Sequence, residues 1–196
     1  MDVAYTSAIA EVIEKLETGN PLPPLVPENA WNNELTDELV ASSLEDLFQG
    51  QSLKDDIFGG AIKSGLLLWN DALNDSHDIS QELSNNTGSY WHGIMHRREP
   101  DYSNAKYWFG RVGTHPIFPS LREHAISIAK EIQNPSDALT QIAQTIETQE
   151  HWDAYQFIDW CQEAENDPSS DVTHFLQQVQ AEEIKLLLAY SYRNAI

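Results

Sequence analysis

Apolar residues recur at helical spacing along most of the chain. Between residues 55 and 73 the apolar positions follow an i, i+3, i+4 pattern almost without a break, which predicts a central helix. Patterns of the same period predict helices over residues 3–16, 36–48 and 175–190. No stretch shows the alternation and β-branched enrichment that indicate a strand between turn signals. The pattern therefore predicts an all-α fold.

Proline-rich and polar segments separate the predicted helices. Residues 21–27 contain four prolines, which is typical of a stiff, extended connector. Residues 1–20 are therefore predicted to form an N-terminal helix that this connector joins to the rest. Residues 70–81 are expected to lead out of the central helix as a polar segment.

A helical hairpin is predicted over residues 89–112, with Pro100 dividing its two helices. Further apolar patterns after Pro116, after Pro135 and over residues 152–161 predict the remaining helices. We expect roughly seven to nine helices in all, because each turn signal ends one helix. Residues 1–196 would then form a single compact all-α domain with a central helical hairpin, because no motif recurs at a fixed period.

The chain is strongly acidic, with a formal net charge of −20 over 196 residues. This charge excludes nonspecific binding to nucleic acid or to an anionic membrane surface, because such binding needs lysine and arginine to neutralise phosphates. Cys161 is the single cysteine, which excludes an internal disulfide and any cysteine-rich zinc site. The first 20 residues lack the features of a secretory signal. We expect a soluble, cytoplasmic protein, and its oligomeric state stays open.

Residues 88–121 gather most of the candidate chemistry of the chain. His92 and His96 are four residues apart on a predicted helix, so their rings lie on one face and could share a divalent metal ion. Gly93 stands where a zincin needs glutamate, which excludes that class. The third ligand would come from one of five residues, namely Glu99, His115, His77, Asp71 or Asp75. The alternative is that both histidines are structural, hydrogen-bonded and partly buried.

Cationic side chains also concentrate here. Arg97, Arg98, Lys106 and Arg111 lie close together in an otherwise acidic sequence. Because a guanidinium group holds carboxylate or phosphate through a planar fork, these residues could bind a small anionic molecule. The alternative for Arg97 or Arg98 is internal pairing with Glu99, Asp101 or acidic groups of the central helix.

Two further side chains are candidates for the same site. His77 could act as a base oriented by Asp78 or Asp75, or it could cap a loop. Trp108 belongs to a set of aromatic residues that would line either the core or a half-wet cleft. With them, the predicted catalytic residues are His92, His96, Glu99 and His77, and the predicted ligand-binding residues are Arg97, Arg98, Lys106, Arg111, His115 and Trp108.

Residues 88–116, preceded by D-S-H-D-I-S-Q, resemble an uncharacterised family of bacterial and fungal proteins. The signature that carries the resemblance reads Y-W-H-x-I-M-H-R-R-E-x-D-x-x-N-A-x-Y-W-F-x-R-V-G-x-H-P. The family has no established activity, so the resemblance implies no substrate, cofactor or catalytic residue. The N-A-K-Y-W-F segment is similar to the second helix of Sel1-like and tetratricopeptide repeats, but no repeat period accompanies it.

These observations favour a cleft between the hairpin and the end of the central helix. It would bind a small anionic molecule, and any chemistry there would be metal-assisted hydrolysis or acid–base catalysis. Whether the protein is an enzyme stays open. The alternatives are a non-enzymatic helical interaction protein, in which the signature residues lock the hairpin turn, and an acidic decoy for basic partners.

Overall fold

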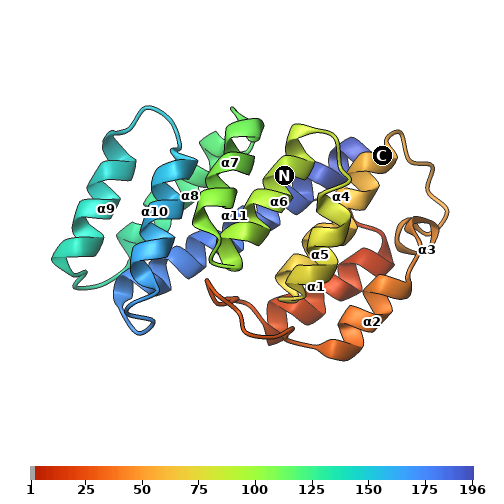
Figure 1. The fold of residues 1–196 in the computed structure, drawn as a ribbon, viewed down its shortest axis with the longest axis horizontal. Coiled ribbons are helices and arrows are strands. Elements are labelled where there is room, and N and C mark those ends of the chain that lie inside the picture. The colour runs from red at the N-terminus through yellow and green to blue at the C-terminus, as the bar shows by residue number, and fades with distance from the viewer. Residues whose placement is uncertain (1–2) are drawn as a thin grey trace.

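The computed structural model describes residues 3–196, and over this range the chain forms eleven helices and no strand (Figure 1). The predicted all-α fold is confirmed, with more helices than the expected seven to nine. The helices are α1 (Ser7–Gly19), α2 (Asn33–Ala41), α3 (Leu44–Phe48), α4 (Asp56–Trp69), α5 (Leu73–Ser80), α6 (Asn86–Arg98), α7 (Tyr102–Val112), α8 (Phe118–Glu131), α9 (Asp137–Thr148), α10 (Ala154–Ala164) and α11 (Asp171–Ala195).

Two of the predicted helices are divided, which accounts for part of the larger number. The segment 36–48 breaks before Ser43, which caps α3 in a reciprocal capping box with Asp46. The central helix ends at Trp69 as α4, and Asp71 follows with a left-handed φ of 62°. We expected residues 70–81 to form only a polar segment after the central helix. This expectation is wrong, because α5 lies within them.

Helix α5 forms from polar residues because small serines let it pack closely on α4. Ser76 is fully buried, and its hydroxyl lies 3.0 Å from the hydroxyl of Ser64 on α4. The same Ser76 hydroxyl donates to the Ser64 backbone carbonyl at 2.9 Å. Buried polar groups that satisfy each other in this way allow a helix to pack without an apolar stripe. The side chain of His77 therefore starts from a fixed helix.

Helix α11 is the longest helix and runs behind the others from the α9–α10 end of the molecule towards α4 (Figure 1). It packs against α4, α8, α9 and α10. Its buried side chains include apolar residues such as Phe175, Val179 and Leu187, and also the polar Gln180 and Glu183. A helix that is buried on several sides in this way forms the centre of a helical domain.

Helices α6 and α7 form the predicted hairpin and pack closely together. Gly93 of α6 makes this possible, because a Cβ there would lie 2.8 Å from the ring of Phe109 on α7. In the same way, Gly65 of α4 leaves room for the ring of Trp91 on α6. Every residue of α6 from Thr87 to Arg98 is buried. The helix that carries most of the candidate chemistry thus lies inside the molecule.

The proline-rich connector between α1 and α2 is held against the helical core by side chains from two helices. Gln180 of α11 donates to the carbonyl oxygens of Pro23 and Pro24 at 3.3 Å, and Arg98 of α6 donates to Pro24 at 3.0 Å. The predicted N-terminal helix is α1, and residues 1–2 lie outside the described residues. Among residues 3–196, no helix combines the length and apolar character needed to cross a bilayer.

Candidate metal centre

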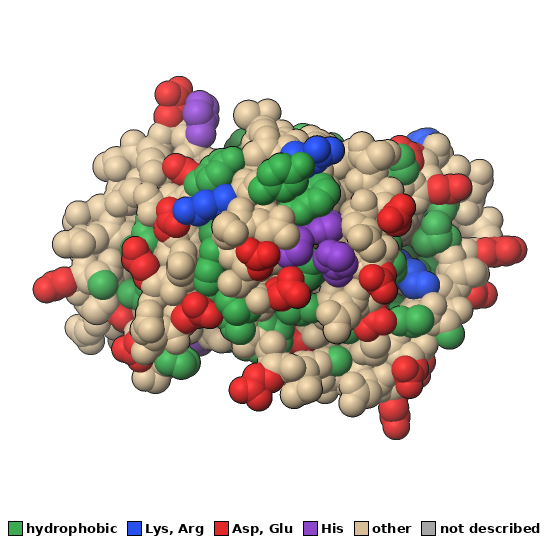
Figure 2. Space-filling model, viewed as in Figure 1, with side chains coloured by type: hydrophobic (Ala, Val, Ile, Leu, Met, Phe, Trp, Pro, Cys, Tyr) green, Lys and Arg blue, Asp and Glu red, His purple; other side chains and the backbone are tan. Residues whose placement is uncertain are grey.

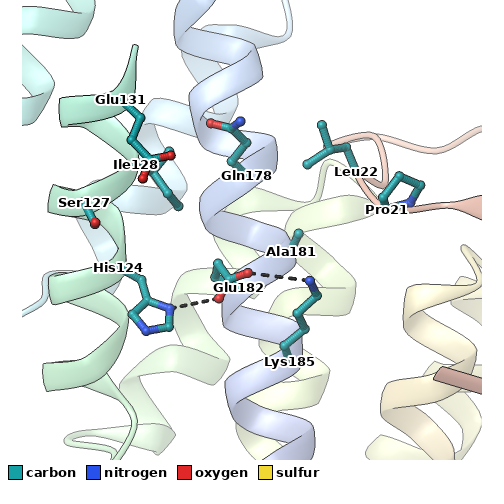
Figure 3. Close-up of a pocket in the computed structure, with 10 residues that line it drawn as sticks. All are labelled: Pro21, Leu22, His124, Ser127, Ile128, Glu131, Gln178, Ala181, Glu182 and Lys185. Carbon is teal, nitrogen blue, oxygen red and sulfur yellow. Dashed lines mark hydrogen bonds and ion pairs between the residues drawn. The ribbon is translucent and has the colours of Figure 1, made fainter. Parts of the chain in front are cut away.

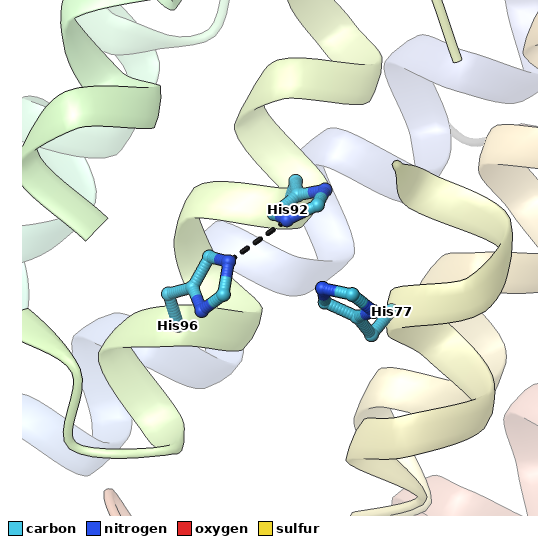
Figure 4. Close-up of side chains that lie close together, drawn as sticks. All are labelled: His77, His92 and His96. Atoms are coloured by element: carbon cyan, nitrogen blue, oxygen red, sulfur yellow. Dashed lines mark hydrogen bonds between the residues drawn. The ribbon is translucent and has the colours of Figure 1, made fainter. Parts of the chain in front are cut away.

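Three histidines from two helices meet on one face of the molecule. His77 lies on α5, and His92 and His96 lie one turn apart on α6 (Figure 4). Each residue offers one ring nitrogen, and the three nitrogen atoms lie within 4.8 Å of one another. The structure thus brings His77, one of the five candidates for a third metal ligand, to the predicted pair. The fourth predicted catalytic residue, Glu99, contacts His96 at its other ring nitrogen.

Glu99 fixes the orientation of the His96 ring. Nδ1 of His96 lies 3.0 Å from Oε2 of Glu99, so a neutral His96 carries its proton on Nδ1 and donates it to the carboxylate. Nε2 is then left with a free lone pair that faces His92. A carboxylate behind a histidine is the arrangement that orients metal-ligating imidazoles in zinc sites.

Two side chains lie within hydrogen-bonding distance of Nε2 of His96. Nδ2 of Asn104, on α7, lies 3.0 Å from Nε2 of His96, and Nε2 of His92 lies only 2.8 Å from the same atom. Two nitrogens that bind one zinc ion at about 2.0–2.1 Å in a tetrahedron are roughly 3.3 Å apart. The pair therefore needs to open by only about half an ångström to hold a metal ion.

Burial keeps the two histidines of α6, His92 and His96, uncharged. It lowers the pKa of His92 to about 4, and the neighbouring His96 and His77 lower it further, as like charges do. Burial also lowers the pKa of His96, against the opposing effect of Glu99. Both imidazoles are thus neutral near pH 7. This is the protonation state that a metal ligand requires, because a protonated ring has no free lone pair.

Solvent reaches the cluster mainly at His77. The side chain of His77 is 33% exposed, whereas His92 and His96 are 2% and 6% exposed. Histidine atoms reach the surface near the middle of the face shown in Figure 2, between hydrophobic and acidic side chains. Trp108 of α7 covers His92 on another side, with the ring centroids 4.0 Å apart. Trp108 thus packs against one ring of the cluster, and its predicted role in ligand binding stays a prediction.

Arg97 is placed away from this cluster, inside the protein. It is 1% exposed and forms an ion pair of 2.5 Å with Glu183 on α11, which also accepts a hydrogen bond from Tyr90 at 2.9 Å. Its guanidinium group lies 4.6 Å from the ring centroid of Phe157. Arg97 is therefore a structural cation. The prediction that it lines an anion-binding cleft is wrong, because its charge is paired inside the protein.

Arg98 is likewise paired internally. It is fully buried and contacts the carboxylate of Asp71, which lies two residues before α5, and the carbonyl oxygen of Leu68 on α4. The sequence left open the alternative that Arg98 pairs internally with an acidic group near the end of the central helix. The structure shows this pairing. The physical reason is that a buried guanidinium group is stable only when carboxylates and carbonyls satisfy it.

The remaining predicted cations and histidine do not join the cluster either. Lys106 pairs with Asp159 on α10 at 2.5 Å, and Arg111 lies 5.3 Å from the ring of Trp108. His115 is buried elsewhere, with Nε2 3.2 Å from the hydroxyl of Thr87, and burial lowers its pKa to about 4. Among the described residues, no lysine or arginine contacts the three histidines, so the structure offers no support there for a purely anionic ligand.

A polar pocket lies beside the cluster, between the α4–α5 junction and the turn from α6 to α7. It has a volume of about 360 Å³, and Asp75, Arg98 and Glu99 are among its lining residues. A larger groove of about 460 Å³ lies elsewhere, between α8, α11 and the connector (Figure 3). None of the three clustered histidines lines the groove or the pocket. The pocket is connected to the cluster through Glu99, which contacts His96.

Sequence reasoning missed Asn104 and Glu183, which hold His96 and Arg97 respectively. Asn104 follows the α7 cap Asp101 by three residues, and this regular spacing could have placed it near the turn. Comparison of the chain with protein-family models, with curated proteins and with solved structures finds no match. The family resemblance of residues 88–116 therefore stays a prediction.

Proposed function

We propose that this protein binds one divalent transition-metal ion, with zinc as the best-fitting ion, through His77, His92 and His96. One coordination position of the ion faces solvent and takes water or a ligand. The ion then supports hydrolytic or acid–base chemistry on a small polar molecule. The observation that carries the proposal is the convergence of three imidazole nitrogens within 4.8 Å of one another, two from α6 and one from α5.

The chemistry of the three ligands favours zinc over magnesium or calcium. Imidazole suits zinc, copper, iron and nickel, whereas magnesium and calcium prefer carboxylate, carbonyl and water oxygens. Three protein ligands with one open position are also typical of catalytic zinc sites, while structural sites are closed by four. Glu99 behind His96 adds the outer partner that such sites share.

A zinc ion at this position would generate a nucleophile near neutral pH. Bound zinc lowers the pKa of a coordinated water to about 7. Trp108 shields the His92 side of the centre, and the 33% exposed side chain of His77 marks the side from which a substrate would enter. The carboxylate of Glu99 is 51% exposed, so it could also exchange a proton with a bound molecule.

The test is zinc binding by metal-stripped protein, measured by calorimetric titration at pH 7 together with elemental analysis of protein purified without added metal. We expect one zinc ion per chain. His77→Ala should weaken binding by about a hundredfold or more, because loss of a ligand costs more than loss of an outer-shell partner. His77 is partly exposed and is not part of the core, so this variant should keep its fold.

The matched control is His124→Ala. His124 lies on α8, is 46% exposed at its side chain and pairs with Glu182, away from the cluster. Zinc affinity should be unchanged in this variant. Wild-type protein that neither binds zinc nor gains thermal stability from zinc, cobalt or nickel would refute the proposal, as would equal losses in the two variants. Tetrahedral absorption bands of bound cobalt would support the three-histidine geometry.

A further inference from the structure

The side chain of Asn104, on α7, lies against the proposed metal centre. Its Nδ2 atom is 3.0 Å from Nε2 and 3.4 Å from Nδ1 of His96. Nearly equal distances to the two nitrogens of one ring place this atom over a face of the ring, because an atom in front of the Nε2 lone pair would lie much farther from Nδ1. Asn104 therefore leaves the lone pair of Nε2 free for an ion.

The register of the two packed helices brings Asn104 to this position. Asn104 and Trp108 are one turn apart on α7, and His96 and His92 are one turn apart on α6. Because α6 and α7 pack closely, Trp108 stacks on the ring of His92 and Asn104 lies over the ring of His96. One ring of the pair thus has an apolar neighbour, and the other has a hydrogen-bond donor.

We infer that Asn104 is a ligand-binding residue of this centre, whose amide donates a hydrogen bond to an oxygen atom of the molecule at the open coordination position of the ion. The inference rests on the proposed function and deepens it. It names the substrate class as molecules that present a carbonyl or carboxylate oxygen to the ion.

The distances place Asn104 within reach of such an oxygen. A zinc ion lies about 2.0–2.1 Å from a histidine nitrogen, so an ion on Nε2 of His96 is at most about 5 Å from Nδ2 of Asn104. An oxygen that binds the ion at about 2 Å and accepts an N–H group at about 2.9 Å has its donor within the same range. The amide and the ion can therefore hold one ligand together.

The N–H groups of Asn104 are also available to a ligand. An amide nitrogen carries two N–H groups, and among the described residues Nδ2 of Asn104 contacts only the ring of His96. No other side-chain donor from outside the cluster forms a hydrogen-bonding contact with its ring nitrogens within residues 3–196. Asn104 is only partly buried, so a molecule that enters from solvent can reach it.

The kind of donor determines the kind of ligand. Phosphate groups are held by arginine and lysine, whereas Asn104 offers an uncharged amide. The carboxylates of Glu99 and Asp101 lie near His96 and disfavour a ligand with several negative charges. A neutral amide beside one divalent ion suits a carbonyl or carboxylate oxygen better than a phosphate.

The test uses cobalt-loaded protein, in which visible absorption reports the binding of a molecule to the ion. Acetate and imidazole are the two probes. Acetate binds an ion through one oxygen and keeps a second that accepts a hydrogen bond, whereas imidazole binds through nitrogen and offers no such acceptor. Asn104→Leu keeps the approximate side-chain volume and removes the amide. It should weaken acetate binding by about tenfold and leave the affinities for imidazole and cobalt unchanged.

Ser103→Ala is the matched control on the same helix. Ser103 is exposed, and its hydroxyl contacts only Asp101. Both probes should bind this variant as they bind the wild type. Circular dichroism of the two variants checks that each keeps its helical fold, and the different responses to acetate and imidazole separate a contact with the ligand from a general disturbance of the site.

The outcomes distinguish this inference from the proposed function. Wild-type protein that binds no cobalt would refute both. Cobalt binding without acetate binding would overturn only the role of Asn104. The same holds if Asn104→Leu affects the two probes equally, affects neither of them, or loses affinity for cobalt itself.

Discussion

The two buried arginines of α6 can be tested by removing each guanidinium group in turn. Arg97→Met keeps much of the side-chain volume but leaves the carboxylate of Glu183, which is 0% exposed, without its cation. Arg98→Met does the same to Asp71, which is 4% exposed at its side chain. Breaking a buried ion pair by removing one partner costs about 3–5 kcal/mol, because the remaining charge stays buried and unpaired.

The magnitude for Arg97 should lie in this range and not above it. Tyr90 still donates to Glu183 after the substitution, so the carboxylate is not left without any partner. For a chain of this length, 3–5 kcal/mol corresponds to a fall in melting temperature of roughly 6–20 °C. Arg111→Met is the control, because Arg111 is exposed and only covers Trp108, and its effect should stay within about 0.5 kcal/mol.

The assay is urea unfolding followed by circular dichroism at 222 nm, with the free energy of unfolding compared among the three variants. A double variant, Arg97→Met combined with Glu183→Leu, should recover much of the stability that Arg97→Met loses, because it removes both charges. The reasoning fails if the Arg97 and Arg98 variants are as stable as the Arg111 variant. In that case both guanidinium groups would be free to hold an anion, as the sequence alone allowed.

Two further predictions concern Glu99, the outer partner in the proposed metal centre, and the buried His115. Glu99→Gln should weaken zinc binding about 10–100-fold, because it removes the carboxylate that orients His96, and calorimetry will show unchanged affinity if Glu99 has no such role. For His115 the folded-state pKa of about 4 lies below the ordinary value of 6.5. Neutral His115 therefore contributes about 3 kcal/mol to the free energy of unfolding above pH 6.5, and this contribution is lost as the pH falls towards 4. In the His115→Gln variant, the free energy of unfolding should therefore decline less steeply with falling pH than in the wild type.

Helical periodicity predicted the fold class because it reports directly on buried faces. It failed at α5, where burial depends on hydrogen bonds between Ser64 and Ser76 and not on apolar side chains. It also could not show that α6 is buried on all sides, since Gly, Ser, His and Arg usually lie at least partly in solvent. One local signal was present, because residues 86–98 contain no Asp, Glu or Lys in a chain that is otherwise rich in acids.

The histidine pair was predictable from the sequence, but the rest of the site was not. The i, i+4 spacing places His92 and His96 on one face wherever that helix lies. Choosing His77 over the other four candidates requires the packing of α5 against α6, which no local pattern encodes. The partner of Arg97 is 86 residues away on α11, so its pairing likewise depends on tertiary structure.

The ion pairs and the histidine cluster are connected through α6. Arg97 fixes α6 to α11, and Arg98, one residue later, fixes it to Asp71 at the start of the α5 segment. A metal centre divided between α5 and α6 requires these two helices to keep their relative position to within about 0.5 Å. Arg98 meets that requirement directly, because Asp71 precedes His77 by less than two turns. The arginines predicted to bind a ligand thus act on the site by positioning its helices.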